Sequence, residues 1–211
     1  LAPNALRDVT GSLPHGSIVV SGTNGKTTTT RLLSHILRGA GLRPIHNRAG
    51  ANLISGLFTA VAQSTDWRGR PLGDVGLFEV DEATLPRALE HISPSVLLLH
   101  NIFRDQLDRY GEVHFVAGLW SAAVSRLSAA TTLVLNADDP LVSGLGSGIT
   151  YGVDDGSVGG ATLPHAADAR LCPRCGGPLR YRLVYYGHLG HYACTRCEFA
   201  RPTPSIAATE I

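Results

Sequence analysis

A glycine-containing loop followed by one lysine and four threonines offers the clearest chemistry in this sequence. The loop, residues 22–30 (GTNGKTTTT), follows a short apolar run at residues 16–21 (GSIVVS). Glycines let backbone N–H groups approach phosphate oxygens, and the N-terminus of a following helix favours a bound anion. In such a loop, Lys26 contacts the terminal phosphates and the Thr27 hydroxyl binds magnesium. The predicted ATP contacts come from seven consecutive residues: Gly22, Thr23, Asn24, Gly25, Lys26, Thr27 and Thr28.

The loop departs in one position from the usual phosphate-loop pattern. Its spacing is G-x-x-G-K-T, because Val20 occupies the place of the first glycine in G-x-x-x-x-G-K-[ST]. The alternative is a glycine-rich turn with an incidental lysine. A strand pattern before the loop and a helix pattern over residues 27–39 favour phosphate binding.

Phosphoryl transfer also needs an acidic residue near the loop to hold magnesium. Glu79 lies near the end of an apolar run at residues 75–80 (VGLFEV). Parallel sheets place ligand-facing groups at the carboxyl ends of their strands. We therefore predict that Glu79 binds magnesium together with Thr27, and that Lys26 and Glu79 are the catalytic pair. A solvated acidic turn suits the neighbouring Asp81 and Glu82 better.

Polar residues also follow two further apolar runs. Residues 101–109 (NIFRDQLDR) follow residues 95–100, and either face the cleft or form a charged, capped helix start. Asn136 and Asp139 follow residues 131–135, and either contact the nucleoside or form an Asx-type turn before Pro140. Taken alone, the turn is favoured. The polar loop at residues 46–56, with His46, Asn47, Arg48 and Asn52, fits substrate binding or ordinary loop capping.

The elements that must position these residues alternate between strand and helix. This order predicts an α/β domain whose mainly parallel sheet is flanked by helices, with a further helix over residues 113–127. After about Gly144 the sequence becomes loop-rich. The chain has 211 residues, with 18 Lys and Arg against 17 Asp and Glu, which argues against nucleic acid as a partner. No apolar run reaches the roughly 18 residues that a membrane span needs.

Four cysteines predict a zinc ribbon near the C-terminus. They form C-x2-C-x18-C-x2-C with Cys172, Cys175, Cys194 and Cys197. Two such pairs complete a closed tetrahedral shell, which indicates structural zinc; two disulfides are the alternative. Arginines around the cysteines leave nucleic-acid binding open, but the balanced charge disfavours it. We expect an ATPase domain at residues 1–165, the ribbon at 166–204, and a tail or a return to the ATPase domain at 205–211.

Four segments together resemble the central ATPase domain of the Mur ligase family: GTNGKTTT, FEVDEA, NIFRDQLDRYGE and LNADDP. The resemblance covers about residues 11–200. These ligases activate a carboxylate with ATP to an acyl phosphate, which an amine then attacks. The ribbon and the sequence motif FRDQLDRYGE resemble those of a subgroup of ligase-like subunits that act with a GatD-like glutamine amidotransferase.

The resemblance implies a cytoplasmic ligase acting at the inner face of the cell membrane with ATP, Mg²⁺ and structural Zn²⁺. Its substrate would be lipid II, whose stem-peptide D-glutamate α-carboxylate is amidated to D-isoglutamine with ammonia from the glutaminase. The alternatives are an amino-acid-adding Mur or folylpolyglutamate-type ligase, and a non-catalytic nucleotide-binding zinc-ribbon scaffold.

The resemblance also marks departures. Gln106 stands where many Mur ligases have a metal-binding histidine, and Trp120 where many have a carbamoylated lysine. Both differences put a second magnesium in doubt. The chain starts at Leu1 and contains no methionine, so we expect a fragment of a longer protein. The resemblance implies a C-terminal domain that closes over ATP; we expect that this fragment lacks it and is inactive on its own.

Overall fold

The computed structural model describes residues 4–47, 50–104, 112–164 and 167–211. Its centre is a seven-stranded sheet in the order β2-β3-β1-β4-β5-β6-β9, in which all neighbours pair in parallel. The strands are β1 Ser17–Ser21, β2 Pro44–His46, β3 Val75–Val80, β4 Val96–Leu99, β5 Thr132–Asn136, β6 Ile149–Val153 and β9 Ile206–Ala208. The mainly parallel α/β sheet expected from the sequence is confirmed.

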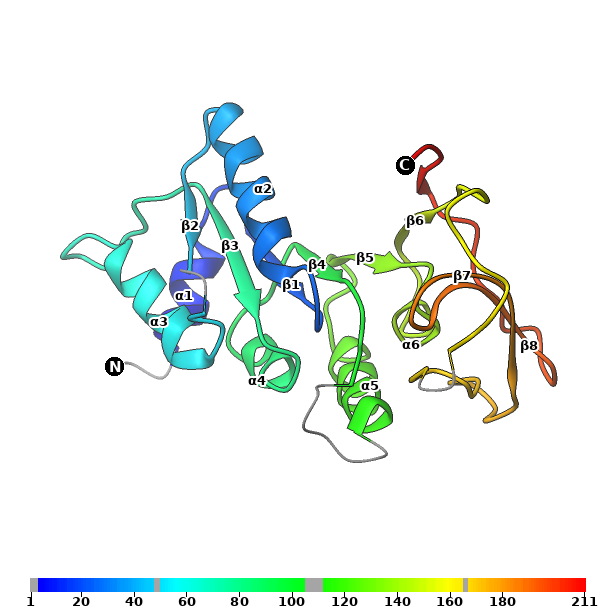
Figure 1. Ribbon diagram of the computed structural model, residues 1–211. Helices are drawn as coiled ribbons and strands as arrows, with labels where there is room; N and C mark the ends of the chain where they lie inside the picture. The colour runs from blue at the N-terminus through cyan, green and yellow to red at the C-terminus, as the bar shows by residue number, and fades with distance from the viewer. Residues whose placement is uncertain (1–3, 48–49, 105–111, 165–166) are drawn as a thin grey trace.

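Helices of very different lengths precede and connect the strands. They are α1 Ala5–Gly11, α2 Lys26–Gly39, α3 Ile54–Gln63, α4 Leu85–Leu89, α5 Glu112–Val124 and α6 Pro140–Ser143. α1 and α3 lie at one end of the molecule, and an antiparallel hairpin, β7 Leu179–Tyr186 with β8 Leu189–Cys194, lies at the other (Figure 1). The predicted helices at 27–39 and 113–127 match α2 and α5 to within a few residues.

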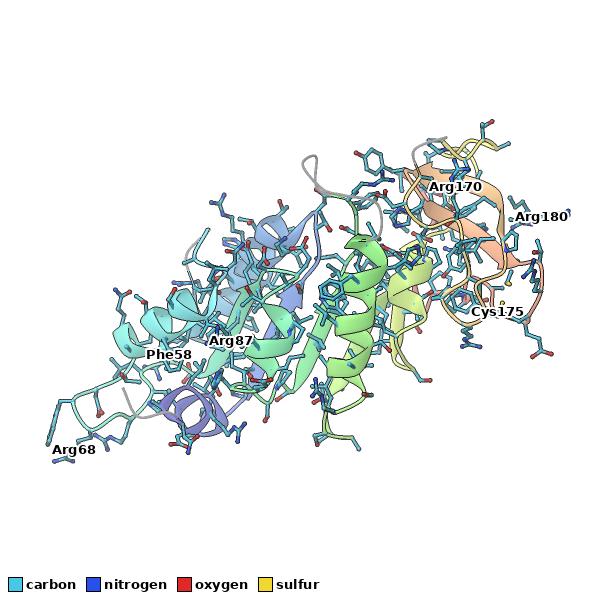
Figure 2. The ribbon with its side chains drawn as sticks, turned by 90° about the horizontal axis from the view of Figure 1, so that it is seen from below. Phe58, Arg68, Arg87, Arg170, Cys175 and Arg180 are labelled. Atoms are coloured by element: carbon cyan, nitrogen blue, oxygen red, sulfur yellow. The ribbon has the colours of Figure 1, made fainter. Side chains whose placement is uncertain are left out.

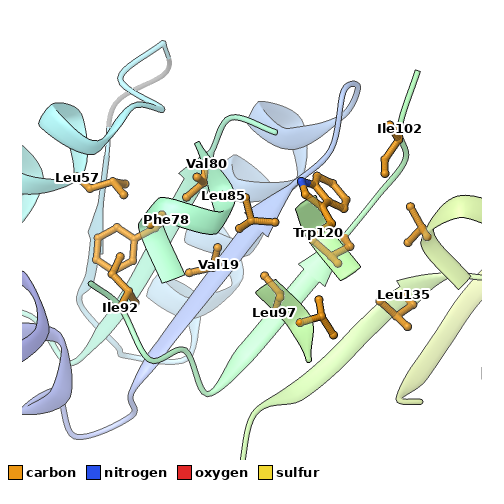
Figure 3. Close-up of a cluster of buried hydrophobic side chains, with 14 of the residues drawn as sticks. Val19, Leu57, Phe78, Val80, Leu85, Ile92, Leu97, Ile102, Trp120 and Leu135 are labelled. Carbon is orange, nitrogen blue, oxygen red and sulfur yellow. The ribbon is translucent and has the colours of Figure 1, made fainter. Parts of the chain in front are cut away.

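The core lies between the central strands and the helices that cover them. β3 is buried over its whole length, as the apolar run predicted for a strand covered on both faces. Phe78, Val19 and Leu97 meet in one continuous cluster, and Trp120 of α5 is fully buried beside them (Figure 3). This packing fixes the strands whose ends carry the polar residues.

The phosphate loop lies at the point in the sheet where the order of successive strands switches from one side of β1 to the other. From β1 the chain proceeds to β2 and β3 on one side, and then returns to β4 on the other. Ligands bind at such switch points, outside the carboxyl ends of the strands. The ends of β1, β3 and β4 are therefore neighbours, as the register Ser21 to Val80 and Ser21 to Leu99 requires.

The part of the chain after Gly144 is more regular than the sequence indicated. β6 pairs with β5, and β9 pairs with β6, so residues 206–208 belong to the same sheet as the phosphate loop. Both strands are short and lack fully buried positions, which removes the apolar signal that marked the other strands. The domain boundaries at residues 165 and 204 stay a prediction.

Candidate functional site

The phosphate loop joins β1 directly to α2. Gly22 and Gly25 have φ values of 149° and 88°, backbone conformations that L-residues with side chains rarely adopt. A Cβ on Gly22 would lie 2.6 Å from the His100 Cβ, whereas Gly25 has open space around it. Gly25 caps α2, which begins at Lys26, and Thr28 is exposed in the first turn. The loop therefore needs glycine at position 22 for both conformation and space.

Gly22→Ala is expected to distort the loop, because the new methyl would overlap His100 at an unfavourable φ. We expect a loss of about 2 kcal/mol or more in unfolding free energy, measured by urea denaturation. Gly25→Ala is the matched control: it carries the strain of a positive φ without the clash. Equal losses for the two variants would show that space at position 22 does not matter.

Residues that follow β4 hold the loop in place. The Asn101 Oδ1 accepts the Asn24 N–H at 2.9 Å, and its carbonyl accepts the Thr23 N–H at 2.9 Å. The Phe103 N–H donates to the Thr23 Oγ1 at 2.9 Å. The first residues of the predicted polar run thus contact the loop. Asp105, Gln106 and Asp108 lie outside the described residues.

Glu79 lies behind the first turn of α2. Its Oε1 accepts the Thr27 hydroxyl at 2.8 Å, its Oε2 accepts the Thr30 hydroxyl at 3.4 Å, and the residue is 3% exposed. The fully buried Asn47 side chain bonds both the Glu79 N–H, at 2.9 Å, and its carbonyl, at 2.8 Å. A hydroxyl beside a carboxylate is a pair of oxygen ligands that suits Mg²⁺. The geometry therefore fits magnesium at Thr27 and Glu79, whose binding stays a prediction.

The loop at residues 46–56 has an internal structural function. Besides its two hydrogen bonds to the Glu79 backbone, the Asn47 amide donates to the Ala51 carbonyl at 2.8 Å. The Asn52 carbonyl accepts the Asp81 N–H at 3.1 Å. Arg48 lies outside the described residues. These bonds match the loop-capping alternative for Asn47, and they tie the loop to the end of β3.

The Lys26 ammonium group uses all three of its protons within the protein. It donates to the Gly22 carbonyl, to the Thr23 carbonyl at 3.2 Å and to the Glu82 Oε2 at 2.9 Å. The side chains of Lys26 and Glu82 are only 12% and 17% exposed. Glu82 is thus an ion-pair partner of the loop lysine and not part of the solvated turn that the sequence suggested. The buried Trp120 indole donates to the Glu82 carbonyl at 2.9 Å and fixes that residue's backbone.

Glu82→Gln is expected to raise the affinity for a magnesium-bound ATP analogue by about fivefold. A phosphate must displace the Glu82 carboxylate from Lys26, and a partly exposed ion pair contributes roughly 1 kcal/mol. Isothermal titration measures this change, with Asp81→Asn as the control because the Asp81 carboxylate accepts the Ala83 N–H in a local turn. An unchanged or weaker affinity would contradict the competition.

Asn136 and Asp139 make the turn that the sequence favoured for them. The Asp139 carboxylate is fully buried, accepts the Ile102 N–H at 2.9 Å, and caps α6 through the Leu141 N–H at 2.8 Å. The Asn136 side chain accepts the Asp138 N–H at 3.0 Å. Their proposed nucleoside contacts stay a prediction.

His100 lies between the loop and β6. Its Nδ1 is 2.6 Å from the Tyr151 hydroxyl, and its buried Nε2 has no hydrogen-bond partner. Burial, with a smaller contribution from the Lys26 charge, lowers the pKa of His100 to about 4. The imidazole is therefore neutral at physiological pH.

This histidine predicts a loss of stability in acid. The unfolded chain binds a proton at His100 near pH 6.5, but the folded chain does so only near pH 4, so stability falls as the pH drops between these values. From pH 7.5 to 5 we expect a loss of about 2 kcal/mol from this group. Comparing urea denaturation of the chain and its His100→Phe variant at both pH values isolates the effect; equal acid losses would contradict it.

The four cysteine sulfurs converge on one point. All lie within 4.8 Å of one another, and the closest pairs are Cys172 with Cys197 at 3.7 Å and Cys175 with Cys194 at 3.5 Å. A disulfide would need about 2.05 Å, whereas sulfurs around tetrahedral zinc lie about 3.8 Å apart. The Arg196 backbone N–H lowers the pKa of Cys194, whereas the neighbouring thiols raise the pKa of Cys197, as expected for close sulfurs that share protons. The residues fit zinc, and the disulfide alternative does not match these distances.

The ribbon hairpin packs against the polar strand ends. His188, in the turn of the hairpin, packs on Phe103 with tilted rings whose centroids are 4.5 Å apart, and its Nε2 lies 3.3 Å from the Asp139 Oδ2. The Gly190 N–H donates to the Asp138 carbonyl, and Arg104 pairs with Asp168. The ribbon therefore contacts the same two segments that hold the phosphate loop and cap α6.

Sequence signals for these supporting residues were weak. Asn101 lay in a segment that was expected to face the cleft, but Asn47, Glu82 and His188 had no spacing that linked them to the loop. Each acts across a long sequence separation, 56 residues for Lys26 with Glu82. Such contacts depend on the order of the strands in the sheet, which local sequence patterns do not predict.

Comparisons with known proteins agree with this geometry. Residues 20–157 match the Mur ligase middle domain. The MurT subunit of lipid II isoglutaminyl synthase (glutamine-hydrolyzing) from Staphylococcus aureus strain COL is 37% identical over 188 residues, 87% of this chain and 41% of that protein. MurT from Streptococcus pneumoniae R6 is 36% identical over 198 residues, 92% of this chain and 43% of that protein. The chain thus spans about two fifths of the length of these relatives.

A solved structure shares the fold over nearly the whole chain. The pseudomurein peptide ligase type C from Methanothermus fervidus superposes with a TM-score of 0.72 and 29% identity, over 95% of this chain and 39% of that one. The phosphate loop, Glu79 and strands β2 to β6 lie within the matched range, which covers most of the chain. The chain belongs to the Mur ligase family.

Proposed function

We propose that this chain is the ATP-binding part of a ligase that amidates the D-glutamate α-carboxylate of the lipid II stem peptide. The product is D-isoglutamine, and a GatD-like glutaminase subunit supplies the ammonia. The observation that carries the proposal is the convergence of Lys26, Thr27 and Glu79 at adjacent strand ends, in a chain similar to MurT subunits. The four-cysteine cluster supports the same subgroup.

The proposed reaction has two steps. The substrate carboxylate attacks the γ-phosphorus of ATP, the bond to ADP breaks, and an acyl phosphate forms. Ammonia then attacks the acyl carbon, loses a proton, and expels inorganic phosphate. Lys26 stabilises the charge on the transferred phosphoryl group once the phosphate has displaced Glu82. Magnesium held by Thr27 and Glu79 would neutralise phosphate charge.

Zinc at the four cysteines would be structural, since four thiolates leave no open position for a substrate.

We place the protein in the cytoplasm, acting at the inner face of the membrane, where lipid II presents its stem peptide. Within the described residues, no helix has the length and apolar character that crossing a bilayer requires.

The test uses the full-length protein that contains this chain, together with its glutaminase partner. We expect glutamine-dependent ADP release on lipid II, with the amide product identified by mass spectrometry. Addition of an amino acid in place of ammonia would support an amino-acid-adding ligase. A chain that gives no magnesium-dependent heat with an ATP analogue would be a scaffold. Either result would overturn the proposal.

One observation weighs against the amino-acid-adding alternative. By the resemblance to Mur ligases, Trp120 stands where many such ligases carry a carbamoylated lysine. The indole is fully buried and donates to the Glu82 carbonyl, so it offers no carboxylate to the site. Ammonia is smaller than an amino acid and carries no carboxylate that needs binding.

A further inference from the structure

Charge is divided unequally between the ribbon and the rest of the chain. Residues 166–204 contain six arginines and two acidic residues, while the remaining residues contain 12 basic and 15 acidic ones. The nearly neutral chain therefore consists of a positively charged ribbon and a slightly negatively charged remainder. The ribbon lies at one end of the molecule, and Arg180 lies far from Phe58 and Arg68 at the other end (Figure 2). A module so placed can approach a flat anionic surface.

The arginines of the hairpin meet at a hollow of about 540 Å³. Arg180 and Arg182 of β7 are both exposed and both line this hollow, on either side of Tyr181, where the pairing of β7 with β8 becomes irregular. The lining also includes the His191 ring of β8, the Arg201 guanidinium and the Asp154 carboxylate. Arg201 is anchored in the floor, where its Nε donates to the Asp138 Oδ1 at 2.7 Å.

A chain of hydrogen bonds holds Arg182 in place. Its Nη2 donates to the His191 Nδ1 at 3.2 Å, and the His191 Nε2 lies 3.0 Å from the Tyr185 hydroxyl, which donates to the Val153 carbonyl at 2.7 Å. Burial and the nearby Arg201 and Arg182 charges lower the pKa of His191, so the ring is neutral and can accept from arginine. One edge of the Arg182 guanidinium is thus fixed, which leaves its other N–H groups for an anion in the hollow.

We propose that this hollow binds the phosphate of an anionic membrane lipid and docks the ribbon on the bilayer. The proposal rests on the proposed function, because a lipid-linked substrate brings the protein to a membrane surface. Guanidinium groups suit phosphate oxygens, and each arginine held at an anionic bilayer strengthens partitioning about fivefold.

A nucleic acid is a poorer fit for this surface. Proteins that bind single strands stack bases on open aromatic rings. Two tyrosines line the hollow, but Tyr192 is 3% exposed and stacked on Phe199, and the Tyr181 hydroxyl is bonded to the Ala169 carbonyl.

The test measures co-sedimentation of the zinc-loaded 211-residue chain with vesicles, without ATP or lipid II. We expect at least tenfold stronger binding to vesicles of equal phosphatidylglycerol and phosphatidylcholine than to phosphatidylcholine alone. Arg180→Glu with Arg182→Glu should lower that binding by about thirtyfold or more. The matched control, Arg68→Glu with Arg126→Glu, makes the same charge change at exposed sites elsewhere and should leave binding within about twofold.

Two further measurements keep the outcomes distinct. Arg182→Lys preserves the charge but removes the planar guanidinium, so we expect vesicle binding to weaken severalfold. If this variant binds vesicles as well as the unmodified chain, Arg182 does not contact the lipid phosphate. Zinc content and urea denaturation of each variant show that the ribbon is folded. Equal binding to neutral vesicles, or tighter binding to a DNA oligonucleotide, would overturn bilayer docking. Because amidation is assayed separately, failure here is distinguishable from failure of the proposed function.

Discussion

Lys26→Ala is expected to abolish detectable binding of a magnesium-bound ATP analogue and to lower ADP release in the full-length enzyme by at least about a hundredfold. Lys26 carries the positive charge of the loop, and removing one preorganised donor to a reacting group costs about 10²–10³ in rate. The ammonium is held at the mouth of the loop by the Gly22 and Thr23 carbonyls. It is therefore already positioned before a nucleotide binds.

The variant needs a control for stability, because it leaves Glu82 partly buried without its cation. Lys26→Ala combined with Glu82→Ala removes both charges and restores local neutrality. If the double variant binds nucleotide as well as the unmodified chain, the loop lysine does not contact phosphate. Arg31→Ala, an exposed substitution one turn further along α2, should leave binding unchanged.

Glu79→Gln separates the metal from the phosphate contacts. The amide keeps the size of Glu79 and can still accept from the Thr27 hydroxyl, but it carries no charge for magnesium. We expect the magnesium dependence of analogue binding to weaken while the loop remains folded, since Asn47 holds the Glu79 backbone and not its carboxylate. Titration at several magnesium concentrations measures this difference.

The phosphate loop could be predicted from sequence because its signal is local. A strand, a glycine turn and a helix follow one another within about 25 residues, and the register of β1 with β3 then brings Glu79 to Thr27. Burial of the whole of β3 was readable from its continuous apolar run. The Glu82 contact was not readable, because it depends on Trp120 fixing a turn from another helix.

The strands at the edge of the sheet could not be predicted from the sequence. β6 and β9 are held by backbone pairing and have no fully buried residue, so neither produces the pattern of a core strand. The spacing of the cysteines predicted a metal cluster but not where the ribbon would dock. Docking depends on shape: Gly187 has a φ of 57° and leaves room for Phe103, whose ring would lie 2.6 Å from a Cβ there. No spacing rule encodes that contact.

Cys175→Ala is expected to lose zinc and unfold the ribbon while the parallel sheet remains folded. The ribbon has a small core of its own, built around Cys172, Leu179, Tyr192 and Phe199. Metal binding worth about 10–16 kcal/mol is what holds such modules together. Elemental analysis should give zinc near one equivalent in the unmodified chain and near zero in the variant. Arg174→Ala, within the same C-x-x-C knuckle but without a ligand atom, should keep its zinc.

Loss of zinc should also reach the nucleotide site, because the hairpin turn supports two of its segments. His188 packs on Phe103 beside Asp139, and Phe103 donates its N–H to Thr23 of the phosphate loop. Hydrogen exchange should therefore quicken at residues 101–104 and 136–139 in Cys175→Ala, while β1 and β3 keep their protection. If exchange changed only within residues 167–204, the ribbon would be an independent module. A change that spreads to Thr23 would make zinc a condition for a well-ordered phosphate loop.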